Sequence, residues 1–235
     1  MDKFFIYITY VFREDIMYIK NLLIATAVIS ALASTSATAA DENKSTSGIY
    51  GGIDIGYGRV NTGAADTAQA LANLAGETVT YSYDKGVGVG RIFLGYTINE
   101  NISTEIAYFT STKLDVNYSS AHGVANENAK ANGGDISVLL RPSASTGLNN
   151  AFLRLGAQYS KVDGSASLAY TSDGTTTIYT ANGNETGAGF LIGAGYDAPI
   201  NKNTSARVSY TYIDNLGGIS GANVNLFSAG LKFDF

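Results

Sequence analysis

The sequence predicts an all-β protein, an eight-stranded antiparallel up-and-down transmembrane β-barrel. The first observation is the run Asn225–Phe235, in which apolar side chains alternate with small or polar ones. This period of two suits a strand with lipid on one side and a polar lumen on the other. The second is that 45% of the residues are hydrophobic, yet no apolar run beyond the amino-terminal region is long enough to span a bilayer as a helix. The third is that alternating segments recur along the chain, separated in turn by tight polar turns and long polar loops.

The amino-terminal segment has the pattern of a secretory signal peptide. Met17–Lys20 precedes the apolar stretch Asn21–Ala33, and Ala37–Ala39 provides the small residues of a cleavage site. We expect cleavage after Ala39 or Ala40. The prediction that the protein is exported depends on this signal alone.

The expected domain organisation follows from that signal. It comprises an extension from a misannotated start codon at 1–16, the signal peptide at 17–39, a short linker at 40–47 and the barrel at 48–235. A genuinely long signal n-region, with Met1 as the initiator, is the alternative for the first segment.

Eight alternating segments are expected to form the barrel strands. They cover residues 48–60, 85–98, 102–114, 134–141, a fifth segment that begins after Asn150, and then 186–198, 204–214 and 225–235. The fifth either stops near Ser160 or continues to Thr171. In the fourth, Ile136, Val138 and Leu140 are expected to face lipid, although Leu139 and Arg141 leave the opposite parity open.

Four long connections are rich in Gly, Ser, Thr, Asn and Ala. They cover Asn61–Asp84, Lys113–Gly133, Ser172–Glu185 and Asn215–Ala222. This composition is typical of solvated loops, with a short helix conceivable at Ala65–Ala75. An even strand count with short turns at one end and long loops at the other fits a bacterial barrel whose loops face outward.

Aromatic residues mark the predicted lipid face. A ring with a polar tip is stable at the boundary between headgroups and hydrocarbon, which predicts girdles of tyrosine. The expected members are Tyr57, Tyr96, Tyr108, Tyr159, Tyr196, Tyr210 and Tyr212. Phe235, with Phe233 and Leu231, is interpreted as a carboxyl-terminal assembly signal, which implies periplasmic chaperones and the barrel-assembly machinery as partners.

Composition argues against several other classes of protein. The net charge of −5 and the lack of a basic stripe disfavour nucleic-acid binding, and the absence of cysteine excludes disulfides and thiolate sites. The one histidine, His122, lies beside serines in a polar loop, which is no recognisable triad. We expect no catalytic site, no metal site and no cofactor.

The chain resembles the family of outer-membrane protein A type transmembrane barrels. The resemblance lies in the order of short phrases at Gly90–Tyr96, Thr97–Ile102, Thr104–Tyr108, Leu155–Tyr159, Gly193–Tyr196 and Ala206–Tyr212, followed by the terminal Phe235. The family includes small surface antigens, opacity-type and adhesin-like proteins. It also includes members with a peptidoglycan-binding domain, which we do not expect after Phe235.

An interior ion pair is predicted from position. Glu105 and Arg207 each lie four residues beyond a turn, on strands that are opposite in an eight-membered ring, so their side chains are expected to meet across the lumen. The resembled family places a gate-like Glu–Arg pair at such positions. Further charges at the same end or at higher levels are Arg154, Asp197, Lys232, Arg91 and Asp54. Inward glycines, such as Gly52 and Gly195, are expected to make room for the long charged side chains.

Two functions remain open at this stage. The first is a monomeric surface protein that is structural and adhesin-like, with outer-membrane lipid and host surface molecules as partners and with the interior charges as a seal. The alternative is a small porin-like ion channel gated by the interior ion pairs. A soluble periplasmic barrel is a third, weaker interpretation.

Overall fold

The computed structural model describes residues 48–61, 80–83, 86–120, 123–143, 145, 147–148, 150–172 and 175–235. The extension, signal peptide and linker predicted over 1–47 lie outside the described residues, as does the short helix expected within 65–75. No helix among the described residues is long and apolar enough to cross a membrane.

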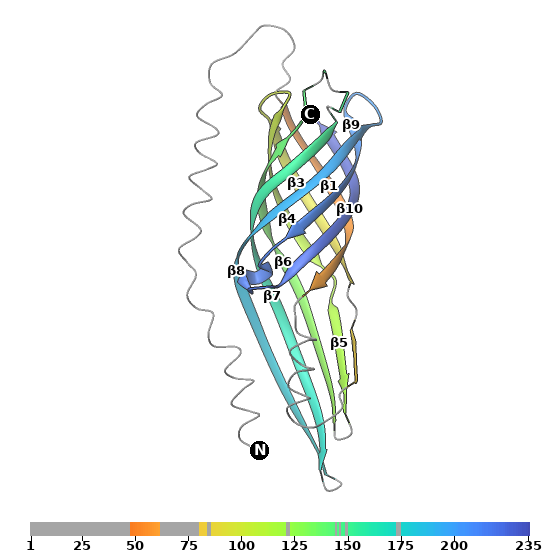
Figure 1. Cartoon of the computed structure of the whole chain (residues 1–235), viewed down its shortest axis with the longest axis vertical. Coiled ribbons are helices and arrows are strands. Elements are labelled where there is room, and N and C mark those ends of the chain that lie inside the picture. Colours follow the sequence, from red (N-terminus) through yellow and green to blue (C-terminus); the bar gives the residue numbers. More distant parts are fainter. Residues whose placement is uncertain are drawn as a thin grey trace. The chain divides into compact units, whose positions relative to one another are not determined.

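Eight of the described strands close into a ring, which confirms the predicted fold class. In ring order they are β1 (Gly48–Asn61), β3 (Gly86–Thr97), β4 (Ile102–Ser111), β6 (Gly123–Leu140), β7 (Ala151–Ser172), β8 (Thr175–Pro199), β9 (Thr204–Ile213) and β10 (Asn223–Asp234). Every pairing is antiparallel, and β10 pairs with β1 to close the ring. The closed ladder leaves these strands no free edge in lipid, as a membrane barrel requires. The C-terminal end and the short turns lie at one end of the barrel (Figure 1).

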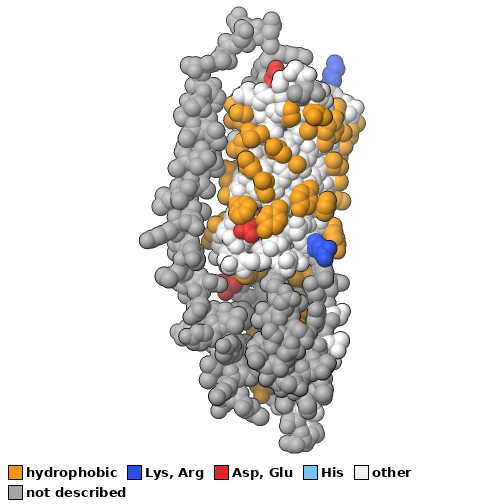
Figure 2. All heavy atoms as spheres, in the orientation of Figure 1, with side chains coloured by type: hydrophobic (Ala, Val, Ile, Leu, Met, Phe, Trp, Pro, Cys, Tyr) orange, Lys and Arg blue, Asp and Glu red, His pale blue; other side chains and the backbone are white. Residues whose placement is uncertain are grey.

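The outer wall of the barrel is apolar. Large side chains at alternate positions are exposed, including Ile55 at 74% and Phe227 at 62%. Figure 2 shows these hydrophobic side chains spread over the visible wall of the barrel. In the fourth strand of the ring Ile136 and Leu140 point outward while Leu139 is fully buried, so the predicted parity is right. This is the surface that lipid covers.

The tyrosines expected at the membrane boundary lie on this wall. Six of them have exposed side chains, namely Tyr57, Tyr96, Tyr108, Tyr159, Tyr196 and Tyr210. Tyr212 is half-buried and donates a hydrogen bond to Asp214 at 3.2 Å. Two of the six flank an outward glycine, since Gly134 pairs with Tyr108 on one side and Tyr159 on the other.

Two of the predicted loops are instead largely strands. Residues 113–133 contain β5 (Leu114–Ser119) and the outer part of β6, and 172–185 lies mostly in β8. β7 and β8 remain paired out to Ser172↔Thr175, so they continue beyond the barrel as a long hairpin (Figure 1). The error came from treating polar composition as evidence for a loop. Thr and Tyr are enriched in strands, and a strand in water needs no apolar face.

We name this outer part the surface sheet. It consists of β2 (Thr80–Tyr83), β5, residues 123–130 of β6, residues 161–172 of β7 and residues 175–186 of β8. Its strand order is β2-β5-β6-β7-β8. It extends three barrel strands and adds two short ones, so the barrel wall and the surface sheet are continuous.

The two short turns that precede β4 and β9 are built alike. Asn99 accepts hydrogen bonds from the backbone N–H groups of Asn101 and Ile102, both at 2.9 Å. In the second turn Asn201 accepts one from Asn203 at 2.9 Å. Each turn therefore uses an asparagine side chain to mimic a backbone turn, which Asn does well. The shared design places β4 and β9 at matching heights on opposite sides of the ring.

Candidate functional site in the lumen

The inner half of the barrel nearest the short turns contains a buried polar cluster. Its members project inward from seven strands and from the end of β6, and they are Tyr50, Asp54, Arg91, Glu105, Asp135, Arg141, Arg154, Asp197 and Arg207. All but Arg141 are 8% exposed or less. Four guanidinium groups face four carboxylates, so the cluster is balanced in charge.

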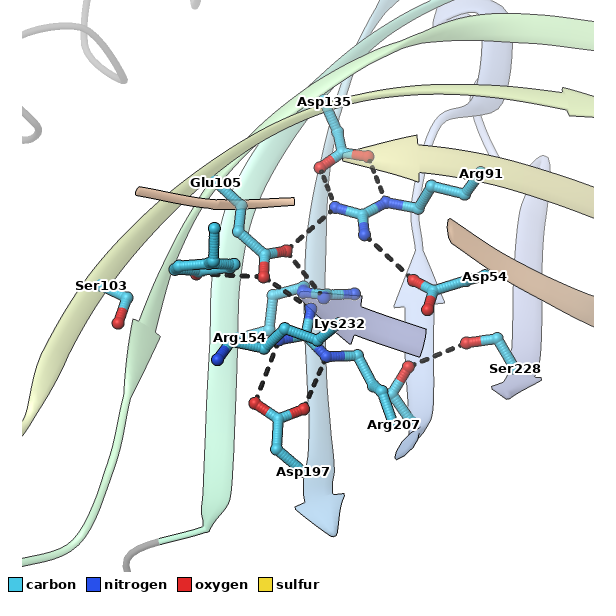
Figure 3. Close-up of polar contacts among 12 residues, drawn as sticks. Asp54, Arg91, Ser103, Glu105, Asp135, Arg154, Asp197, Arg207, Ser228 and Lys232 are labelled. Atoms are coloured by element: carbon cyan, nitrogen blue, oxygen red, sulfur yellow. Dashed lines mark hydrogen bonds and ion pairs between the residues drawn. The ribbon is translucent and has the colours of Figure 1, made fainter. Parts of the chain in front are cut away.

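Glu105 is the centre of the cluster (Figure 3). Its Oε1 accepts hydrogen bonds from Arg207 Nη1 at 2.6 Å and from the Tyr50 hydroxyl at 3.2 Å. Its Oε2 accepts from Arg154 at 3.0 Å and from Arg91 at 3.3 Å. One carboxylate thus joins strands on opposite sides of the ring, and Glu105 and Arg207 do meet across the lumen.

Arg207 extends the cluster toward the short turns. It binds Asp197 through two contacts, Nε to Oδ1 at 2.7 Å and Nη2 to Oδ2 at 3.1 Å. Asp197 also accepts a hydrogen bond from Arg141 at 2.8 Å, and Arg141 donates to Ser103 at 2.9 Å. A two-point arginine–carboxylate contact fixes the planes of both groups, so this end of the cluster is well ordered.

Arg91 extends the cluster in the opposite direction. It donates two hydrogen bonds to Asp135, both at 3.0 Å, and one to Asp54 at 3.2 Å. Buried charges are costly unless they are paired and hydrogen-bonded, and here each arginine has at least one carboxylate partner. The pairing makes the buried cluster tolerable within the membrane.

Two aromatic rings support the guanidinium groups. The Arg207 guanidinium carbon lies 4.6 Å from the ring centre of Phe93 and 5.0 Å from that of Phe152. These rings occupy the space that glycines leave. An added Cβ at Gly52 would lie 2.4 Å from Phe93, and one at Gly195 would lie 2.3 Å from Phe152. Gly52 and Gly195 therefore accommodate the rings beneath the arginines, whereas Gly230 makes room for a charged side chain, since a Cβ there would lie 2.4 Å from Asp54 Oδ1.

Most of the predicted interior charges are brought together, and Lys232 is the exception. Its ammonium group pairs with Asp234 and lies 4.8 Å from the ring centre of Tyr50, at the edge of the cluster. Sequence reasoning missed the roles of Asp135, Arg141 and Tyr50. All three had a usable signal, because Asp135 and Arg141 have the parity of buried Leu139 and Tyr50 has the parity of Asp54.

The outer half of the lumen is apolar, which the sequence analysis did not predict. We name this region the apolar chamber. Its walls are Val60, Val87, Val89, Phe109, Leu114, Ala129, Ala131, Val162, Leu191, Ile213, Val224 and Leu226. Leu216 of the short 3-10 helix η3 (Leu216–Gly218), together with Ile219 and Ala222, completes the lining. The chamber encloses a cavity of about 100 Å³, and Arg91, Asp135 and Arg154 of the polar cluster also line it.

The comparisons identify the family of this barrel. A model of the OmpA-like transmembrane domain matches residues 35–235. The chain belongs to that family. It is accordingly an OmpA-like β-barrel of the bacterial outer membrane, with outer-membrane lipid around its apolar wall. No curated protein matches the sequence at a significant level.

Several solved structures are similar to this OmpA-like chain. Neisserial surface protein A is 15% identical, with a TM-score of 0.40 over 80% of this chain and 97% of that one. Ail of Yersinia pestis, solved with the heparin analogue sucrose octasulfate, is 13% identical, with a TM-score of 0.42 over 80% of this chain and 99% of that one. OprG of Pseudomonas aeruginosa is 11% identical, with a TM-score of 0.34 over 80% and 95%.

The structure adds nothing on catalysis at the one histidine, because His122 lies outside the described residues. Within the described part of the chain, no group of three or more His, Cys, Asp or Glu side chains is arranged to hold a metal ion. That the protein has no catalytic activity stays a prediction of the sequence.

Proposed function

We propose that this OmpA-like protein is a sealed barrel that displays the surface sheet to the exterior and acts there as an adhesin-like surface protein. The observation that best supports a sealed lumen is the burial of the polar cluster. Glu105 and Arg207 are each 1% exposed, and Tyr50 is fully buried. An eight-stranded barrel has room for little more than its own side chains, and these side chains fill the half of the lumen nearest the short turns.

The display role is supported by the surface sheet. A row of apolar and aromatic residues crosses one side of it, because Tyr118 pairs with Ala125, Ala125 with Leu168, and Leu168 with Tyr179. Tyrosine is enriched where proteins bind other molecules, since it offers a large rigid surface with a polar tip. We propose that this row contacts a host surface molecule, and that the barrel holding it is monomeric.

Cell adherence tests the display role. Bacteria that carry the protein are compared with bacteria that carry Tyr118→Ser together with Tyr179→Ser, for binding to cultured epithelial cells. We expect a several-fold loss with the double variant, while heat-modifiable mobility shows that the barrel still folds. Ile178→Ser is the matched control, because Ile178 belongs to the same strand at the opposite parity and is 70% exposed. Wild-type adherence equal to that of cells lacking the protein would contradict the proposal.

A second candidate function is an ion channel gated by the cluster. It is favoured by the way in which Glu105 shares its two oxygens among Arg207, Arg154 and Arg91, since partners can be exchanged without moving the carboxylate far. Conductance across a planar bilayer separates the two functions. If the barrel is sealed, the wild-type protein gives no stable current, and only the Glu105→Ala variant should conduct. A steady wild-type current would favour the gated channel.

A further inference from the structure

We propose that the apolar chamber is a binding site for a small amphiphile, one aromatic or branched apolar group that carries a single anionic group. A simple aromatic carboxylate is the model ligand. This inference rests on the lumen alone and is independent of the display function.

The size of the cavity suits one small apolar group. Its volume is about 100 Å³, and an engineered cavity of about 150 Å³ lined by Leu, Ile and Phe stays dry and binds benzene. The space exists because small side chains stand at several inward positions. Ala129, Ala131 and Ala222 lie where larger residues would close it. Away from the polar cluster the lining is mostly aliphatic, with Phe109 as its one aromatic ring, which matches an apolar ligand.

The roof of the chamber is held in place by specific bonds. The backbone N–H of Gly217 donates to Ser160 Oγ at 2.8 Å, and Gln158 Nε2 donates to the carbonyl of Asn215 at 3.2 Å. Gly217 and Gly218 have φ values of 68° and 77°, which suits glycine and lets the turn fold tightly over the lumen. Leu216 and Ile219 are therefore positioned as fixed parts of the lining.

The wall shared with the polar cluster favours an anion. Arg91 and Arg154 line the cavity, against the single carboxylate of Asp135. Arg91 uses three of its nitrogens on carboxylates. Arg154 differs, since it contacts only Glu105 by an ion pair, and its Nε has no hydrogen-bond partner among the described residues. Arg154 is 3% exposed, and a buried N–H without a partner is costly.

A bound anion would supply the hydrogen-bond acceptor that Arg154 Nε lacks. A carboxylate near Arg154 gains a charge-assisted hydrogen bond, which is stronger than one between neutral groups. The apolar body of the ligand would then lie among Leu191, Ile213 and Val224, whose side chains are already buried. Arrangement and charge together point to an amphiphile rather than to a purely apolar molecule or a cation.

Titration with benzoate tests the site. Protein from bacterial outer membranes, with labelled Ile, Leu and Val methyl groups and placed in phosphatidylcholine nanodiscs, is titrated with benzoate, toluene and benzylamine. We expect saturable methyl shifts for Leu191, Ile213 and Val224, with benzoate binding roughly tenfold more tightly than toluene and benzylamine not binding. Equal binding of benzoate and benzylamine, or no saturable shift with benzoate, would overturn the proposal.

A filling variant supplies the second test. Ala131→Leu adds three carbon atoms inside the chamber and should abolish the benzoate shifts at Ile213 and Val224. Ala222→Leu fills the same space from the roof and gives an independent answer if the first variant folds poorly. Ala194→Leu is the matched control, because this alanine is exposed on the outer wall. Binding that persists in both filled variants would place the ligand elsewhere and contradict the assignment.

Discussion

Glu105 shows how a single residue determines the state of the lumen. Its carboxylate is shared by three guanidinium groups, and it is 1% exposed. Without it, the four guanidinium groups of the cluster would face only three carboxylates, and Arg154 would lose its ion pair. A buried ion pair adds little to the stability of the fold, whereas an unpaired buried charge destabilises it strongly. Glu105 therefore stabilises the barrel chiefly by keeping the buried arginines paired.

The first prediction concerns the charge of this carboxylate. Glu105→Gln keeps the shape of the side chain and removes its charge, and breaking a buried pair in this way costs about 3–5 kcal/mol. We expect the free energy of unfolding, measured by urea titration of the protein in lipid vesicles, to fall by that amount. Ser137→Ala is the control, because Ser137 pairs with Glu105 in the sheet and its buried hydroxyl has no hydrogen-bond partner among the described residues. Equal losses in both variants would show that the charge is not the cause.

The second prediction concerns the glycines beneath the aromatic rings. A Cβ at Gly195 would lie 2.3 Å from Phe152 and 2.7 Å from the carbonyl oxygen of Val208, so Gly195→Ala forces the ring to move. Such overpacking costs about 1–3 kcal/mol. Gly90→Ala is the same change at a position with no described atom within 4 Å, and it should leave stability nearly unchanged. A harmless Gly195→Ala would show that Phe152 and its arginines have other room.

At the scale of single residues, the sequence was informative where it gave both the face of the strand on which a residue lies and its distance from a turn. Glu105 and Arg207 could be paired because each follows a turn at the same distance. Lys232 has the right parity, but Asp234 lies two residues away on the same face and binds it locally. The open Nε of Arg154 could not be foreseen, since it depends on the directions of side chains that meet from several strands.

At the scale of the element, β10 has two roles, one at its edge that pairs with β1 and one on its outward face. It closes the ring against β1, and the backbone N–H of the following Phe235 donates to Ile49 at 3.0 Å. Its outward face carries Leu231, Phe233 and Phe235, which are 38%, 38% and 80% exposed. We propose that these three side chains form the ridge that the barrel-assembly machinery recognises, after delivery by periplasmic chaperones.

The third prediction tests this ridge. Phe235→Ala should lower the amount of folded protein in the outer membrane several-fold, while the variant refolded in detergent unfolds like wild type. The amount is measured by heat-modifiable mobility of outer-membrane fractions. Phe227→Ala removes another exposed aromatic side chain of the same strand and should assemble normally. A parallel loss of assembly in cells and of stability in detergent would assign Phe235 to packing instead of recognition.

Strand positions in the barrel wall were predictable, and strand lengths were not. Where one face meets lipid, a one-residue slip would expose the wrong side chains, so alternation determines parity. Outside the membrane this constraint vanishes. Residues 175–186 of β8 are exposed at every position, and their sequence, which is rich in Thr and Asn, has no apolar alternation. Only the pairing with β7 makes them a strand.

At the scale of the whole molecule, the barrel and the surface sheet differ in what stabilises them. The barrel combines a buried polar cluster in its lumen with an apolar wall in lipid. The surface sheet is held by strand pairing and by an exposed ion pair between Lys161 and Asp163 at 2.5 Å, which contributes little in water. The barrel should therefore fold and persist without the outer end of the sheet.

The last prediction removes that outer end at matched positions. Gly164 pairs with Gly183, so replacing residues 165–182 by Asn-Gly, a favoured two-residue hairpin turn, shortens β7 and β8 without changing their register. The shortened protein loses only pairing that water surrounds, and in lipid vesicles its thermal midpoint should stay within about 4 °C of wild type, the shift that corresponds to roughly 1 kcal/mol at this size. Circular dichroism melting measures it, and the Glu105→Gln variant, which weakens the lumen, provides the contrast. A larger fall on shortening would mean that the surface sheet supports the barrel, and the division of the molecule into a stable barrel and a displayed sheet would be wrong.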